Sequence, residues 1–155
     1  MNRYLNYLKI KERVGDKVVL LKYDIEEKDI RMLKEVYQSV GWHKHNELII
    51  EKVFNASTHV VVALVDGKIV GFVRALSDGV FNAAIYDVVV HKKFQGQGIA
   101  RLLLEDMKQQ LENVSCIQLI ATTGNVPFYE KMGFKKLKTG MGIYKNQQLA
   151  QEYLE

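Results

Sequence analysis

Two apolar, β-branched runs joined by Asp66-Gly67 constrain the fold of this chain more than any other feature. The runs are HVVVALV (59–65) and KIVGFVRAL (68–76). An Asp-Gly pair between two such runs favours a two-residue hairpin turn, because both central residues of that turn need positive φ angles. The sequence therefore predicts an antiparallel pair of strands in the middle of the chain.

The segment after the hairpin predicts a parallel pair. We expect an apolar strand over 81–90, then a helix, then a strand over 115–121. The helix carries its apolar residues on one stripe, formed by Ala100, Leu103, Leu104, Met107 and Leu111. Strand, helix and strand in that order imply two parallel strands joined by a crossover.

Further elements are expected on both sides of this centre. A strand over 17–23, a helix over 27–40 and a second helix from Asn46 precede the hairpin. After the parallel pair, a short helix begins at Asn125 or Val126, with Pro127 in its first turn and Gly133 at its end. A closing β pair over 134–144 and a polar tail over 146–155, for which a helix is one option, end the chain.

These elements together predict an α/β (α+β) fold in a single domain over 1–155. Its core is expected over about 18–145, after an N-terminal extension of residues 1–16. The central mixed sheet should have about six to seven strands, antiparallel early and parallel at its centre, with helices on both faces.

Composition limits the classes of partner. The chain has 155 residues, 48% hydrophobic and 26% charged, which is ordinary for a soluble domain, and a formal charge of +4 that favours anionic partners. It contains no run of about 20 apolar residues and no signal-peptide pattern, so we expect a cytoplasmic protein without a membrane partner. The lone Cys116 is expected in a buried strand.

The loop FQGQGIARLLL (94–104) is a candidate binding site for a phosphate group. Glycines before a helix leave its N-terminal N–H groups open to a phosphate, although a tight strand-to-helix turn also needs glycine. A dinucleotide site of the form GxGxxG does not fit, because Arg101 stands where the third glycine belongs. A P-loop does not fit either, since no GxxxxGK run exists.

The pattern [Gln/Arg]-x-x-Gly-x-[Gly/Ala] does fit, filled by Gln95, Gly98 and Ala100 after the strand DVVV. A second motif, NVPFYEKMGF, covers 125–134. With these two motifs the chain resembles the GNAT superfamily of N-acetyltransferases, over about 18–144. The segments GW, FNAAIYDVVV, FQGQG and FYEKMGF are similar to the branch that includes plant and cyanobacterial aralkylamine (serotonin-type) acetyltransferases and their bacterial relatives.

The resemblance implies that acetyl-CoA is the co-substrate, with its pyrophosphate in the glycine loop. It implies these cofactor-binding residues: Val88, Val89, Val90, Gln95, Gly96, Gln97, Gly98, Ile99, Ala100, Arg101, Asn125 and Phe128. It also implies that Tyr129 is the general acid. A phenol with a pKa of about 10 stays protonated at neutral pH and can protonate a departing thiolate.

The group that removes the proton of the acceptor amine is predicted less directly than the acid. An ordinary aspartate has a pKa of about 3.9 and an alkylammonium about 10.4, so direct proton removal by Asp87 would be uphill by about 9 kcal/mol. Asp87 is therefore predicted either to bind the substrate ammonium as its anchor or to stand at one end of a chain of water molecules that relays the proton. Histidines titrate nearer neutrality, and His43, His45 and His91 are available. No metal site is expected, because His43 and His45 have no third ligand beside them.

The acceptor side leaves alternatives open. Trp42 is expected either to line an aromatic acceptor pocket or to pack in the core. The predicted activity is transfer of acetyl from the thioester to a primary amine of a small molecule. Protein or peptide N-acetylation and a non-catalytic acyl-CoA-binding regulatory module are the alternatives. No nucleic-acid partner is expected, since basic and aromatic residues do not interleave. A homodimer is an expectation from the resemblance.

Overall fold

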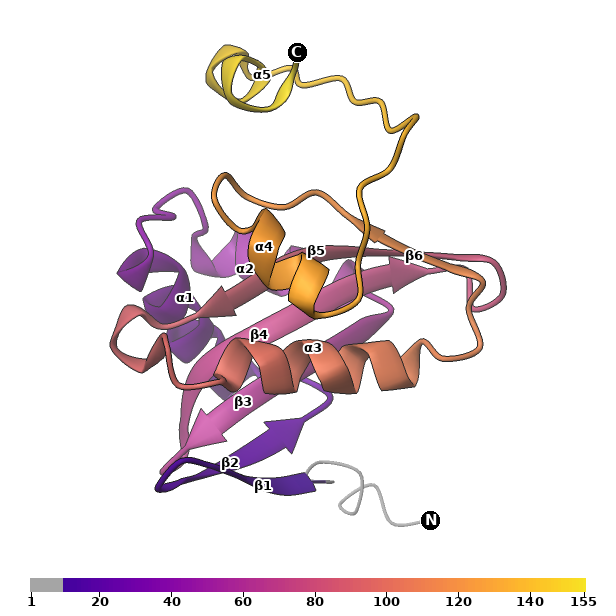
Figure 1. Cartoon of the computed structure of the whole chain (residues 1–155). Coiled ribbons are helices and arrows are strands. Elements are labelled where there is room, and N and C mark those ends of the chain that lie inside the picture. The colour runs from indigo at the N-terminus through magenta and orange to yellow at the C-terminus, as the bar shows by residue number, and fades with distance from the viewer. Residues whose placement is uncertain (1–9) are drawn as a thin grey trace. The chain divides into compact units, whose positions relative to one another are not determined.

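The computed structural model describes residues 10–155, which form two compact units, one running to Ile120 and one from Ala121 to Glu155 (Figure 1). The strands are β1 (Ile10–Val14), β2 (Lys17–Lys22), β3 (His59–Val65), β4 (Lys68–Ser77), β5 (Asn82–Val90) and β6 (Cys116–Leu119). The α-helices are α1 (Ile30–Ser39), α2 (Glu47–Ala56), α3 (Ile99–Gln110), α4 (Val126–Lys131) and α5 (Gln147–Tyr153), and two short 3-10 helices are η2 (Glu27–Asp29) and η3 (Lys92–Phe94).

The first unit is built on a six-stranded sheet in the order β1 to β6. Neighbouring strands are antiparallel except β5 and β6, which are parallel and joined through α3. Helix α3 contacts β3, β4 and β5 on one face of the sheet, while α1 lies against β4 and β5 on the other (Figure 1). The mixed sheet with helices on both faces confirms the predicted fold class.

The core lies on both sides of this sheet. On the face of α1 and α2, the buried side chains include Leu33, Tyr37, Ile50, Phe54 and Phe72. Phe54 meets Phe72 edge-on, with ring centroids 5.2 Å apart. On the face of α3, the predicted leucine stripe is confirmed, since Leu103, Leu104 and Met107 have no exposed surface.

A β-bulge interrupts the pairing of β4 with β5. Arg74 lies opposite Asp87 and Ala75 lies opposite Ile85, so Tyr86 is one extra residue on β5. Directly opposed residues point to the same face of a sheet, and one extra residue moves every later side chain to the other face. Ile85 therefore points with Ala75 toward α3, whereas Asp87 points with Arg74 toward α1 and α2.

Strand β5 keeps only one strand partner along its second half. It pairs with β6 from Asn82 to Ile85, and within residues 10–155 no strand continues that pairing beside Asp87 to Val90. The N–H of His91 donates to the Val70 carbonyl at 2.8 Å. Since alternate residues of a strand direct their backbone groups to opposite sides, Val88 and Val90 present theirs away from β4.

Three expectations from the sequence need correction. The β pair predicted over 134–144 is wrong, because these residues are irregular, and glycines at 140 and 142 weaken any strand there. Cys116, predicted to be buried, is exposed because it lies on β6 at the edge of the sheet. Of the extension 1–16, residues 1–9 lie outside the described residues, and residues 10–14 form β1, an unpredicted strand.

The second unit contains two short helices. Helix α4 follows Asn125, has proline in its first turn and ends before Gly133, which has a φ of +91°. The Asn146 side chain accepts a hydrogen bond from the Leu149 N–H at 3.0 Å and caps α5, so the tail is helical. The single-domain boundaries predicted from the sequence remain a prediction.

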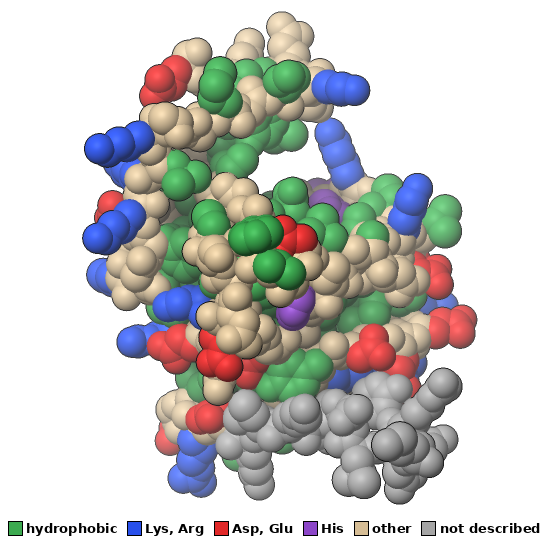
Figure 2. Space-filling model, turned by 90° about the vertical axis from the view of Figure 1, so that its right-hand side faces the viewer, with side chains coloured by type: hydrophobic (Ala, Val, Ile, Leu, Met, Phe, Trp, Pro, Cys, Tyr) green, Lys and Arg blue, Asp and Glu red, His purple; other side chains and the backbone are tan. Residues whose placement is uncertain are grey.

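The surface of the molecule is mixed in character. In the connection between β4 and β5, Val80 and Phe81 are 57% and 64% exposed. Figure 2 shows hydrophobic side chains at the surface of one face, beside charged ones of both signs. Among the helices of residues 10–155, none is long and apolar enough to span a bilayer.

Candidate active site

A largely buried ion pair between Arg74 and Asp87 lies on the α1 and α2 face of the sheet, just beyond the point where the pairing of β5 with β6 ends. The Asp87 Oδ2 atom accepts hydrogen bonds from Arg74 Nε at 2.6 Å and from the Tyr37 hydroxyl at 2.8 Å. Arg74 also donates to Ser57 Oγ at 3.4 Å and stacks over the Tyr86 ring at 5.3 Å. The charge of Asp87 is therefore already matched inside the protein.

Tyr37 links this ion pair to an aromatic stack. Its ring is fully buried, and burial together with the charge of Asp87 raises the pKa of Tyr37, so its hydroxyl keeps the proton that it donates. The His45 ring lies parallel to the Tyr37 ring, with centroids 4.0 Å apart. Trp42 stacks at 5.9 Å from Tyr37 and 5.8 Å from His45. Trp42 and Asp87, both predicted on the acceptor side, thus each contact Tyr37.

His45 carries an unusual nitrogen. Its Nδ1 atom is buried, and among the described residues it has no hydrogen-bond partner. Burial is the main cause that lowers the pKa of His45; Arg74 adds to the effect and Asp87 opposes it. The imidazole is therefore neutral at neutral pH. Within residues 10–155, no three histidine, cysteine or acidic side chains group as metal ligands.

The glycine loop joins β5 to α3 through η3. Gly96 and Gly98 have φ angles of +74° and +87°, in the left-handed region that glycine adopts without a steric penalty. Gly98 is the N-cap of α3, so Ile99, Ala100 and Arg101 form its first turn. The N–H groups of a first turn have no partner inside the helix and carry the positive end of its dipole. The loop therefore offers an anion-binding surface made of backbone.

Side chains of the loop bind the protein itself. Gln95 Nε2 donates to the Val90 carbonyl at 3.0 Å and ties the loop to β5. Gln97 Nε2 donates to the Lys93 carbonyl at 3.3 Å. Arg101 is exposed and pairs with Glu105 at 3.0 Å. Val88 is half-buried, and the side chains of Val89 and Val90 are buried, so only their backbone is available to a ligand.

Asn125, Phe128 and Tyr129 belong to the second unit. Phe128 and Phe134 both meet the Tyr129 ring at steep angles, with centroids 5.1 and 5.9 Å away. Burial raises the pKa of Tyr129 above the usual value for a phenol. The Asn125 side-chain Nδ2 donates to Thr122 Oγ1 at 2.6 Å. The backbone carbonyl of Asn125 accepts hydrogen bonds from the N–H groups of Phe128 and Tyr129.

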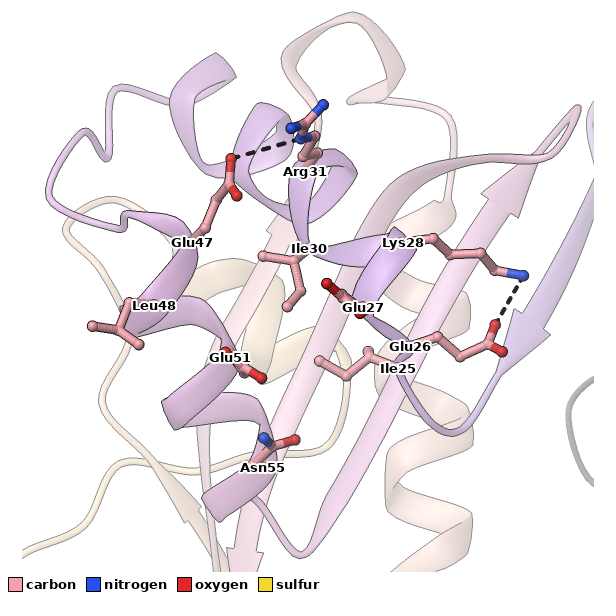
Figure 3. Close-up of a pocket in the computed structure, with 10 residues that line it drawn as sticks. All are labelled: Ile25, Glu26, Glu27, Lys28, Ile30, Arg31, Glu47, Leu48, Glu51 and Asn55. Atoms are coloured by element: carbon pink, nitrogen blue, oxygen red, sulfur yellow. Dashed lines mark ion pairs between the residues drawn. The ribbon is translucent and has the colours of Figure 1, made fainter.

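A groove of about 930 Å³ lies elsewhere in the first unit, between the start of α1 and helix α2 (Figure 3). Apolar side chains such as Ile30 and Leu48 line it together with acidic ones such as Glu27 and Glu51. Figure 3 shows Glu47 turned toward Arg31, and these two side chains approach to 3.9 Å. None of the residues predicted to act in catalysis lines this groove.

Sequence reasoning missed two residues of this site, Tyr37 and Arg74. Tyr37 was expected only as an apolar position of the helix predicted over 27–40, and Arg74 was given no role. His45 was named as a candidate base, but its stacking on Tyr37 was not predicted. A signal for Arg74 was present, since it is the one charged residue inside the apolar run IVGFVRAL. A charge at a strand position flanked by buried residues needs a partner.

Comparison with known proteins gives consistent matches. A family described as "Acetyltransferase (GNAT) domain" matches residues 45–146. The uncharacterized N-acetyltransferase ycf52 of Pyropia yezoensis is 38% identical over 116 residues, which are 70% of this chain and 66% of that protein. The chloroplastic serotonin N-acetyltransferase 2 of Oryza sativa subsp. japonica is 35% identical over 135 residues, which are 79% of this chain and 66% of that protein.

A solved structure has the same fold. The GNAT-family acetyltransferase of Streptococcus pneumoniae superposes with a TM-score of 0.71 at 28% identity, over 83% of this chain and 98% of that one. The chain thus spans slightly less than two thirds of the length of the Pyropia yezoensis and rice proteins, and nearly the whole of the streptococcal one.

Proposed function

Because the chain belongs to the GNAT superfamily of N-acetyltransferases, we propose that it transfers an acetyl group from acetyl-CoA to a primary amine of a small molecule. One observation carries the proposal. The second half of β5 presents backbone groups that no strand within residues 10–155 takes up, and it leads directly into a glycine loop and the N-terminus of α3. An extended thioester arm followed by a diphosphate suits these two features in that order.

The backbone of the first unit would hold the donor. Val88 would present its N–H and carbonyl groups, and Val90 its N–H group, to the pantetheine arm, since the Val90 carbonyl already accepts from Gln95. An N–H there would polarise the thioester oxygen as an oxyanion hole does. The N–H groups from Gly96 to Arg101 would bind the pyrophosphate. The buried side chains of Val89 and Val90 keep the strand in place.

Tyr129 is proposed as the general acid. The thiolate of coenzyme A leaves when the amine nitrogen attacks the carbonyl carbon and the carbon–sulfur bond breaks. The Tyr129 hydroxyl would then give its proton to the sulfur, while the attacking nitrogen would lose its proton to water, and Tyr129 would regain a proton from the solvent. Burial raises the pKa of Tyr129, which supports this role because the group stays protonated at neutral pH.

The acceptor amine is proposed to meet Asp87 beside the aromatic stack. Since Oδ2 of Asp87 already accepts from Arg74 and Tyr37, an incoming ammonium would use Oδ1. Trp42 and His45 would form the neighbouring aromatic wall. This arrangement suits an amine with an apolar or aromatic body, and the similarity to the rice serotonin N-acetyltransferase 2 supports the same substrate class.

A panel of amines tests the proposal. Purified protein with acetyl-CoA would be mixed with arylalkylamines, polyamines, amino acids, aminoglycosides and N-terminal peptides while free thiol is followed. We expect turnover with small amines, fastest with arylalkylamines. Turnover on peptides alone would replace the proposal by protein N-acetylation. Acetyl-CoA binding without turnover on any acceptor would favour the regulatory module.

The Gly98→Ala variant should bind acetyl-CoA more weakly. An alanine at a φ of +87° costs about 1–2 kcal/mol of stability. A Cβ there would also lie 3.3 Å from Val14 Cγ1, which disturbs the loop. Gly79→Ala is a matched control, because Gly79 has a φ of +78° in the β4–β5 connection with nothing within 4 Å of a Cβ. Calorimetry should show weaker acetyl-CoA binding for Gly98→Ala alone. Equal affinity of the two variants would contradict the loop's role.

Location and assembly follow the same proposal. We propose the cytoplasm as the site of action and a homodimer as the assembly. The rice relative is named as chloroplastic, so cell fractionation is the measurement that separates the two compartments. Sedimentation of the purified chain measures its assembly.

A further inference from the structure

The β1–β2 hairpin reaches the glycine loop. Lys17, the first residue of β2, donates from Nζ to Gln97 Oε1 at 2.7 Å, across 80 residues of sequence. The same ammonium lies 4.6 Å from the centre of the Phe94 ring. On the preceding strand, Val14 lies close enough to Gly98 that an added Cβ would meet its Cγ1 atom at 3.3 Å.

These contacts fix the side chain of Gln97. Its oxygen accepts from Lys17 and its nitrogen donates to the Lys93 carbonyl, so both ends of the amide are engaged. An engaged amide holds the backbone between Lys93 and Gly98 in one conformation. The β1–β2 hairpin therefore stabilises the conformation of the glycine loop through a contact that was not predicted from the sequence.

Lys17 also brings positive charge to the loop. An ammonium group has three N–H donors, and Gln97 takes one of them. Lys17 is half-buried, and its ammonium lies over the Phe94 ring, so its charge is fixed in position more firmly than that of the exposed Lys92 and Lys93. Arg101, a further cation beside the loop, forms an ion pair with Glu105.

We propose that Lys17 is part of the diphosphate site: it holds the glycine loop in its binding shape and places a positive charge beside the pyrophosphate of acetyl-CoA. The inference rests on the proposed function of the loop. It makes the N-terminal hairpin a component of the donor site and Lys17 a positioning residue rather than a catalytic one.

Two lysine variants test this. Lys17→Met removes the charge, the hydrogen bond to Gln97 and the contact of the ammonium with Phe94, but keeps an unbranched side chain. Lys68→Met is the matched control, because Lys68 is the exposed first residue of β4 and also follows a two-residue turn. Both variants lose one positive charge.

Acetyl-CoA affinity is measured by calorimetry at low and at high salt. We expect about tenfold weaker binding for Lys17→Met at low salt, a smaller difference at high salt, and no change for Lys68→Met. The amine KM and kcat at saturating acetyl-CoA should stay the same. Lys17→Arg should retain most of the affinity.

A double-variant cycle separates bracing from charge. Gln97→Leu should weaken binding in the wild-type chain and have little further effect in Lys17→Met, because the two side chains act through one contact. Wild-type affinity for Lys17→Met, or equal weakening by Lys17→Met and Lys68→Met, would overturn the inference. If the wild-type protein fails to bind acetyl-CoA, the proposed function itself is overturned and this inference with it.

Discussion

The Tyr129→Phe variant is expected to lower kcat by about 10²–10⁴-fold while acetyl-CoA binds as tightly as before. The change removes only the hydroxyl that would protonate the departing thiolate. The ring contacts with Phe128 and Phe134 remain, so the fold of the second unit should be kept. Turnover by thiol release and affinity by calorimetry are the two measurements.

The pH profile adds a second readout of Tyr129. An acid acts in its protonated form, so kcat should be constant through neutrality and fall as the pH rises through the pKa of Tyr129. Burial raises that pKa, which places the fall above the value of about 10 for a free phenol. Tyr144→Phe serves as the control, since Tyr144 stacks on Tyr153 within the same unit. Unchanged kcat in Tyr129→Phe would exclude the proposed acid.

The Arg74→Met variant is expected to lose about 3–5 kcal/mol of unfolding free energy. It leaves the carboxylate of Asp87, whose side chain is only 11% exposed, without its charge partner. For a chain of this size the loss corresponds to a fall in Tm of roughly 6–20 °C. Denaturant unfolding followed by circular dichroism measures the free energy.

Two further variants test the physical reason for that loss. Arg101→Met removes an exposed ion pair, with side chains 69% and 52% exposed, and should change stability by less than about 1 kcal/mol. The double variant Arg74→Met with Asp87→Leu should recover most of the stability, because it removes both buried charges. It should still lack turnover if Asp87 receives the amine. An Arg74→Met variant as stable as the wild type would show that the ion pair between Arg74 and Asp87 does not stabilise the fold.

The glycine loop was predictable because its properties are local. Positive φ angles at Gly96 and Gly98 and the position of a helix N-terminus follow from a dozen neighbouring residues. The same holds for the Asp66-Gly67 hairpin, whose two strands pair as predicted. Such features depend on backbone preferences that a short segment carries with it.

The acceptor side was predictable only in part, because it is assembled over long range. Tyr37 and Asp87 are 50 residues apart and meet through a hydrogen bond of 2.8 Å. The two-residue alternation along β5 puts Ile85 and Asp87 on one face. The bulge at Tyr86 places them on opposite faces, and only the pairing with β4 reveals it.

The bulge has a consequence for which sequence changes the chain can tolerate. Tyr86 is 56% exposed, so other side chains at this position cost β5 little beyond the stacking on Arg74. Deleting the residue restores regular pairing of β5 with β4, in which Asp87 can stay opposite Arg74 and Ile85 opposite Ala75. The chemistry at this point of the strand therefore depends on Asp87 staying opposite Arg74, and the strand can lose the bulged residue without moving Asp87 to the other face.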